Sequence, residues 1–216
     1  MDPLLHFSQC YRPLLLSLYK NGRTGVRVLD RLRSRLDSSL TTVGRWFSKV
    51  WPSPTAWTAV GLVASVLAGI SYSTSGYPGE AVGAVLILVA GWFDIVDGAV
   101  ARATGRTSKQ GAFLDSTLDR VAEIALFSGI LWGGYAPPIL VLVALASSLL
   151  VSYTRAKGDA LGVALSGVGI GERSERLLIV AITSLLGLVY WGVILVILVA
   201  SYTFLERTFR AVRALK

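Results

Sequence analysis

The chain has 216 residues, of which 53% are hydrophobic and 16% are charged, and its mean hydropathy is +0.61. This apolar share exceeds that of an average soluble domain, so the composition excludes a soluble globular protein and predicts a membrane protein. The net charge is +8, but the basic residues stand at the ends of apolar stretches. That distribution favours a membrane surface over nucleic acid as the partner. A single cysteine, Cys10, excludes an intramolecular disulfide and a cysteine-based metal site.

Residues 1–50 are predicted to form a cytoplasmic N-terminal segment that contains an amphipathic helix. Between residues 24 and 50, apolar side chains recur at close to helical spacing and arginines lie between them. Such a helix lies on the anionic inner leaflet, and Trp46, Phe47 and Trp51 favour an interfacial position. A solvated charged tail is the alternative. Residues 51–216 are then expected to form one membrane domain.

Six apolar stretches follow Pro54, each about 20 residues long, which is the length that spans a hydrocarbon core of about 30 Å. They predict an all-α polytopic protein with six transmembrane helices. The expected spans are about 55–74, 80–102, 112–134, 138–157, 174–190 and 192–210. Lys and Arg gather in alternate connections, so the positive-inside rule predicts a cell-membrane protein whose two termini and basic loops face the cytoplasm.

The second and third predicted spans carry four aspartates. Asp94 and Asp97 are three residues apart on one helix, and Asp115 and Asp119 are four apart on the next, so each pair shares a helical face. The short connection between the two spans predicts an antiparallel hairpin, in which the two aspartate pairs lie at the same depth in the membrane. A charged carboxylate inside the membrane costs free energy, so such residues generally have a function. Their oxygens suit Mg²⁺, Mn²⁺ or Ca²⁺, and two such ions could clamp a transferring phosphate.

The arrangement of these residues resembles the complete motif of a known family, the CDP-alcohol phosphotransferases. The pattern is D-x-x-D-G-x-x-A-R, then eight residues, then G-x-x-x-D-x-x-x-D. Its specified positions are Asp94, Asp97, Gly98, Ala101, Arg102, Gly111, Asp115 and Asp119. The wider resemblance covers about residues 50–210 and implies the six-helix membrane fold of that family.

The resemblance also implies a reaction. A phosphatidyl-type group would pass from a CDP-linked lipid, CDP-archaeol or CDP-diacylglycerol, to an alcohol, with release of CMP. The four aspartates would be the metal ligands, with two Mg²⁺ ions expected and Mn²⁺ as an alternative, and Asp119 would also be the general base. The residues implied to bind the CDP-lipid are Gly98, Ala101, Arg102 and Gly111. A homodimer is implied as well. From the residues alone, helix packing is the better explanation of Gly98 and Ala101.

Two basic pairs bear on the second substrate. Arg155 and Lys157 end the fourth predicted span, and Arg173 and Arg176 begin the fifth. Their charge suits either an acceptor phosphate or the cytoplasmic flank of a membrane helix. The surrounding stretches resemble the branch of the family that uses inositol phosphate. This resemblance implies that the acceptor is inositol 1-phosphate and that these four basic residues bind its phosphate. The alternatives are glycerol 3-phosphate, serine or an inositol derivative.

The sequence leaves three further points open: a different function, the role of a glycine-rich stretch, and the partners of Arg120 and Glu123. A cation transporter would also use intramembrane carboxylates, although all four aspartates lie toward one side. The glycine-rich stretch 158–171 could be a flap over the site or a flexible linker. Arg120 is expected to pair with Glu123 within its own helix, while Glu123 also follows the face of Asp115 and Asp119.

Overall fold

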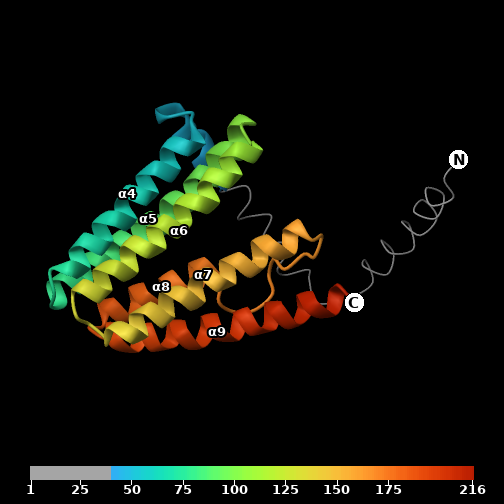
Figure 1. The fold of residues 1–216 in the computed structure, drawn as a ribbon. Helices are drawn as coiled ribbons and strands as arrows, with labels where there is room; N and C mark the ends of the chain where they lie inside the picture. The colour runs from blue at the N-terminus through green and yellow to red at the C-terminus, as the bar shows by residue number, and fades with distance from the viewer. Residues whose placement is uncertain (1–39) are drawn as a thin grey trace, which may run out of the picture. The chain divides into compact units, whose positions relative to one another are not determined.

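The computed structural model describes residues 40–216, so the predictions for residues 1–39, including most of the amphipathic helix, lie outside the described part. Residues 40–50 are helical. The helices that follow are α4 (Pro54–Ser73), α5 (Tyr77–Thr104), α6 (Lys109–Trp132), α7 (Pro138–Ala160), α8 (Arg173–Leu185) and α9 (Val189–Ala214) (Figure 1). The described residues contain no strand. For these residues the prediction of an all-α protein is confirmed.

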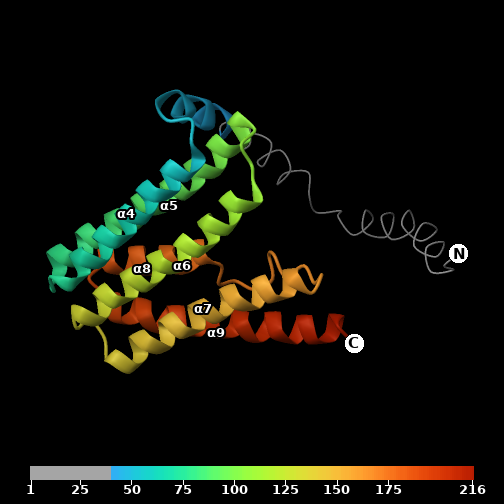
Figure 2. The same cartoon turned by 45° about the horizontal axis from the view of Figure 1, so that its top comes forward.

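Within residues 43–216 the six long helices form two groups of three. Helix α4 packs against α5 and α6, whereas α7 packs against α9, and α8 packs against both α9 and α5 (Figures 1 and 2). The main apolar core fills the space between the groups, with Tyr72, Phe127 and Val193 among its buried side chains. Helix α8 therefore joins the two groups, and polar residues at its start can reach both.

Glycine allows the closest helix crossing in the first group. A Cβ at Gly129 of α6 would overlap the carbonyl oxygen of Gly69 in α4, and a Cβ at Gly69 would overlap the carbonyl oxygen of Ala125. Small residues at such crossings let membrane helices approach backbone to backbone. This crossing anchors α6 against α4 and so sets the position of the aspartates on α6.

Four of the helices, α4, α5, α7 and α9, are long and apolar enough to cross a membrane. Helix α6 has the length but carries Asp115, Asp119, Arg120 and Glu123, which interrupt its apolar run. Helix α8 ends at Leu185, not near residue 190 as expected, and has 13 residues. At 1.5 Å per residue that is about 20 Å, less than the hydrocarbon core. The two departures from six apolar spans are therefore the interrupted apolar run of α6 and the short length of α8.

The predicted pair between Arg120 and Glu123 is wrong. Glu123 Oε1 accepts hydrogen bonds from Nη2 and Nε of Arg176 on α8, at 2.6 and 3.2 Å, and both side chains are only 1% exposed. Arg120 instead donates to the carbonyl oxygen of Ser116. Glu123 faces the interior between the two helix groups, so it pairs with the cation that is buried beside it.

Breaking this buried pair is expected to destabilise the fold. Glu123→Gln would leave the Arg176 guanidinium buried without its counterion, which typically costs about 3–5 kcal/mol. Thermal unfolding in detergent should show a large drop in Tm. The matched control is Glu206→Gln, because Glu206 pairs with Arg210 at 2.6 Å on the surface of α9 and such pairs contribute about 0–1 kcal/mol. Equal shifts in the two variants would contradict the assignment.

Candidate active site

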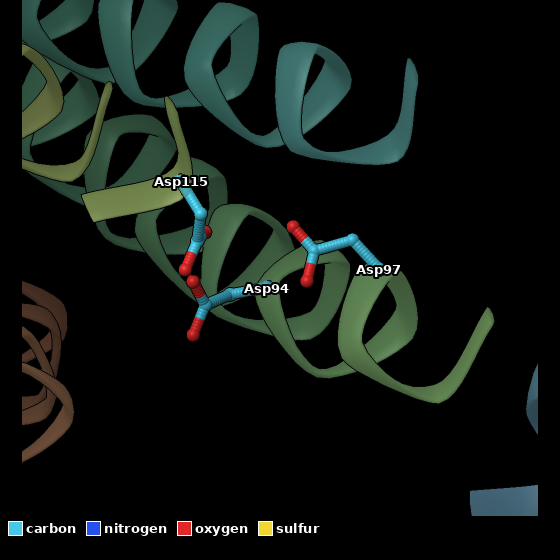
Figure 3. A group of neighbouring side chains, drawn as sticks. All are labelled: Asp94, Asp97 and Asp115. Carbon is cyan, nitrogen blue, oxygen red and sulfur yellow. The ribbon is translucent and has the colours of Figure 1, made fainter. Parts of the chain in front are cut away.

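Three of the four aspartates converge between α5 and α6. One carboxylate oxygen from each of Asp94, Asp97 and Asp115 lies within 4.8 Å of the other two. Figure 3 shows the carboxylates of Asp94 and Asp115 facing each other, with that of Asp97 directed toward the same space. Helix α5 ends at Thr104 and α6 begins at Lys109, so the hairpin expected from the sequence brings these carboxylates level.

The free oxygens of this cluster suit a hard cation. Asp97 is buried, and its Oδ2 accepts a hydrogen bond of 2.7 Å from Thr58 Oγ1 on α4. Asp115 Oδ1 is buried and has no hydrogen-bond partner among the described residues. Oxygen ligands of this kind are those that Mg²⁺ and Mn²⁺ prefer. Thr58 was missed by the sequence analysis because its contact with Asp97 spans 39 residues.

Asp119 has a different environment, dominated by Arg173. Arg173 Nη1 lies 2.8 Å from Asp119 Oδ1 and 3.1 Å from Asp94 Oδ1. Because Arg173 is the first residue of α8, this one guanidinium links α5, α6 and α8. The sequence predicted Arg173 to be a phosphate ligand and carried no sign of its contact with the two aspartates.

A cavity of about 690 Å³ opens beside the aspartates and is bounded by α5 to α9 and the residue before α8. Its charged lining residues are Asp94, Asp115, Asp119, Arg120, Arg155, Asp159, Glu172, Arg173, Arg176 and Arg207. Apolar side chains such as Trp92 of α5 and Leu178 of α8 complete the wall. Carboxylates and guanidinium groups thus line one space, which can hold cations and a phosphorylated molecule together.

The predicted basic residues are distributed unevenly around this cavity. Arg155 and Arg173 line it, and Lys157 is not among its lining residues. Arg176 also lines it, but its guanidinium is held by Glu123 and by the carbonyl oxygen of Gly171, at 2.6 Å from Nη1. The Arg176 guanidinium thus already has partners within the protein, and its role in binding an acceptor phosphate stays a prediction.

The residues predicted to bind the CDP-lipid lie outside this lining, at the end of the α5–α6 hairpin. The guanidinium of Arg102 lies over Gly98, with Nη1 3.4 Å from where a Cβ would stand. Gly111 donates its backbone N–H to Ser108 Oγ at 3.0 Å, which caps α6. Ala101 is half-buried on the same turn of α5 as Arg102. The local structure therefore gives Gly98 and Gly111 packing and capping contacts.

The glycine-rich connection before α8 is held in place by buried arginines. Arg207, which is 2% exposed on α9, donates from Nε to the carbonyl oxygen of Val168 at 2.9 Å and from Nη2 to Glu172 Oε1 at 3.1 Å. These contacts tie the end of the segment to α9, which speaks against a free linker, and the alternative of a flap over the site stays a prediction. On α9, Arg207 continues the buried stripe of Ala200 and Thr203 at helical spacing.

Comparison of the sequence with known protein families identifies the family of this chain. The sequence model of the CDP-alcohol phosphatidyltransferases matches residues 51–205. The chain belongs to this family. As a CDP-alcohol phosphatidyltransferase it is a transmembrane transferase of phospholipid biosynthesis, and the transporter alternative is not favoured.

Several relatives of this phosphatidyltransferase have been named. The archaetidylinositol phosphate synthase of Pyrococcus horikoshii is 32% identical over 189 residues, which cover 88% of this chain and 99% of that protein. The phosphatidylinositol phosphate synthase of Streptomyces avermitilis is 48% identical over 103 residues, which cover 45% of this chain and 42% of that protein.

A solved structure also resembles the phosphatidyltransferase. The crystal structure of Mycobacterium tuberculosis phosphatidylinositol phosphate synthase with CDP-DAG bound has a TM-score of 0.69 and 28% identity, covering 80% of this chain and 92% of that one. A second crystal structure of the same enzyme, with manganese and citrate, has the same TM-score and identity.

Proposed function

We propose that this transferase moves the phosphatidyl-type group of a CDP-linked lipid to inositol 1-phosphate and releases CMP. The observation that carries the proposal is that the carboxylate cluster adjoins an arginine-lined cavity, because Asp94 and Asp115 belong to the cluster and also line the cavity. The relatives named as inositol phosphate synthases support the choice of acceptor. CDP-archaeol and CDP-diacylglycerol are both proposed as donors, and the structure with CDP-DAG belongs to a relative.

Divalent cations are proposed to bind at Asp94, Asp97, Asp115 and Asp119, as two Mg²⁺ ions or Mn²⁺ ions. The fit rests on the close oxygens of three carboxylates and on the unpartnered Oδ1 of Asp115 among the described residues. The related enzyme from M. tuberculosis has been crystallised with manganese. Bound ions would supply positive charge to the diphosphate of the donor and to the charge that develops during displacement.

Asp119 is proposed as the general base. In the reaction the acceptor hydroxyl oxygen forms a bond to the lipid-bearing phosphorus, the bond from that phosphorus to the CMP oxygen breaks, and the hydroxyl proton passes to Asp119. Asp119 lines the cavity and lies outside the group of three close carboxylates, which supports a role distinct from that of a metal ligand alone. Thr58 would hold the Asp97 carboxylate in its orientation through their hydrogen bond.

The acceptor phosphate is proposed to bind to Arg155 and Arg173, which line the cavity from α7 and α8. Lys157, two residues after Arg155 on α7, stays a proposed contact of the acceptor phosphate. The proposed CDP-lipid residues are Gly98, Ala101, Arg102 and Gly111. We further propose that α6 crosses the membrane with the four apolar helices and that α8, about 20 Å long, lies within the membrane as the sixth membrane segment. Both termini and the site are proposed to face the cytoplasm, and the protein is proposed to be a homodimer.

An acceptor screen tests the function. CMP release would be measured with CDP-archaeol or CDP-diacylglycerol, Mg²⁺, and inositol 1-phosphate, glycerol 3-phosphate, serine or free inositol. The proposal expects the highest kcat/KM with inositol 1-phosphate. A higher value with another acceptor would replace it, and the donor pair would show which lipid backbone is preferred.

Arg155→Ala is expected to raise the KM for inositol 1-phosphate and to leave the KM for the CDP-lipid nearly unchanged. Loss of one charge-assisted contact to a phosphate costs about 1.5–3 kcal/mol, or roughly ten- to hundredfold. Steady-state CMP release measures both constants. Arg210→Ala is the matched control, because Arg210 is an exposed arginine on α9 outside the cavity lining. Equal effects of Arg155→Ala on both substrates would move this residue to the nucleotide side.

A further inference from the structure

We propose that Arg173 couples the cation site to the acceptor site. A divalent cation that binds the aspartates takes over the carboxylates that Arg173 holds, and the released guanidinium becomes a partner for the acceptor phosphate. The cation and the acceptor anion therefore bind cooperatively. The inference rests on the proposed function for the identity of the anion, whereas its first step concerns only Arg173, the aspartates and a metal ion.

The geometry makes Arg173 and a divalent ion competitors for the same oxygens. Arg173 Nη1 contacts Asp119 Oδ1 at 2.8 Å and Asp94 Oδ1 at 3.1 Å. The Asp94 carboxylate is also a member of the close group with Asp97 and Asp115. A guanidinium and a divalent ion at this distance repel each other, and the ion binds carboxylates directly as ligands. Loading of the aspartates with a cation therefore weakens the hold of Asp94 and Asp119 on Arg173.

Once a cation is bound to the aspartates, another anion would stabilise the Arg173 guanidinium. Its side chain is only 20% exposed, and its Nε is buried without a hydrogen-bond partner among the described residues. A guanidinium that is largely removed from water and has lost its carboxylate partners costs free energy, because nothing offsets its desolvation. The cavity offers the replacement, because Arg155 lines the same space and two guanidinium groups suit a phosphate. The acceptor phosphate thus restores the charge balance that the metal ion removes.

Arg155 provides the matched comparison. It lines the same cavity but forms no ion pair with a described carboxylate. If removing any positive charge from the cavity tightened metal binding through the general field, the Arg155 and Arg173 variants would behave alike. Direct competition for carboxylates predicts an effect at Arg173 that is absent at Arg155.

The first experiment uses the metal alone. Mn²⁺ would be titrated into the full-length wild type, Arg173→Gln and Arg155→Gln in detergent, with free Mn²⁺ followed by electron paramagnetic resonance and folding checked by thermal unfolding. Arg173→Gln is expected to bind Mn²⁺ about fivefold tighter or more, which is the usual size of a coupling between sites. Arg155→Gln should match the wild type. Unchanged or weaker Mn²⁺ binding in a folded Arg173→Gln protein, or equal tightening in both variants, overturns the proposal.

The second experiment adds the anion. In the wild type, inositol 1-phosphate should tighten Mn²⁺ binding, and Mn²⁺ should tighten inositol 1-phosphate binding by the same factor. Arg173→Gln should lose this mutual effect. If inositol 1-phosphate fails to bind with or without Mn²⁺, the proposed acceptor is wrong, and inorganic phosphate takes its place as the probe. Wild-type binding of either anion that is independent of Mn²⁺ overturns the coupling.

Discussion

Excess EDTA is expected to abolish CMP release, and added Mg²⁺ or Mn²⁺ is expected to restore it. The carboxylates of Asp94, Asp97 and Asp115 are crowded within 4.8 Å, so without cations they repel one another and the diphosphate of the donor. Bound ions contribute several kcal/mol of charge stabilisation in phosphoryl transfer, which corresponds to about a thousandfold or more in rate. CMP release before and after chelation measures the loss.

Recovery of activity is the control for this result. If the chelated protein regains its rate when excess Mg²⁺ is supplied, the loss reflects removal of the cation and not unfolding. Thermal unfolding with and without Mn²⁺ gives a second readout, because a ligand that binds the folded state raises the apparent stability. Full turnover in excess EDTA would exclude the proposed chemistry.

Asp119→Asn is expected to lose turnover while retaining much of its affinity for the CDP-lipid. A positioned general base contributes about 10²–10⁴-fold to a rate, and an amide cannot accept the hydroxyl proton. Some loss of metal affinity is also expected because one carboxylate charge disappears. Single-turnover CMP release at saturating Mg²⁺ separates the chemical step from binding, and equilibrium binding of the CDP-lipid measures the affinity.

Asp159→Asn is the matched control for Asp119→Asn. Asp159 lines the same cavity from the end of α7 but is not a member of the close carboxylate group. Its replacement removes the same charge from the cavity without removing the proposed base, so turnover should stay near that of the wild type. Near-normal turnover in Asp119→Asn would refute the base assignment, and equal losses in both variants would point to the charge of the cavity.

Local periodicity accounts for what could be predicted from the sequence. Helical geometry relates residues three and four apart, and a short connection restricts the hairpin. The spacing therefore predicted that four aspartates, Asp94, Asp97, Asp115 and Asp119, lie at one depth, and carboxylate oxygens of the first three lie within 4.8 Å of one another. The four apolar helices were predictable because about 20 apolar residues are needed to cross a bilayer. The α5–α6 motif also identified the family, since its specified positions lie within one hairpin.

The partners of Arg173, Arg176 and Arg207 were decided by the tertiary structure alone. Arg173 contacts Asp94 across 79 residues of sequence, Arg176 contacts Glu123 across 53, and Arg207 contacts Glu172 across 35. A charged residue at a helix end has the same sequence pattern whether it faces water, lipid headgroups or a buried carboxylate. Which of these it meets depends on the packing of α8 between α5 and α9. The sequence by itself therefore determined the helices and the carboxylate cluster, whereas the packing of distant helices decided which cations surround it.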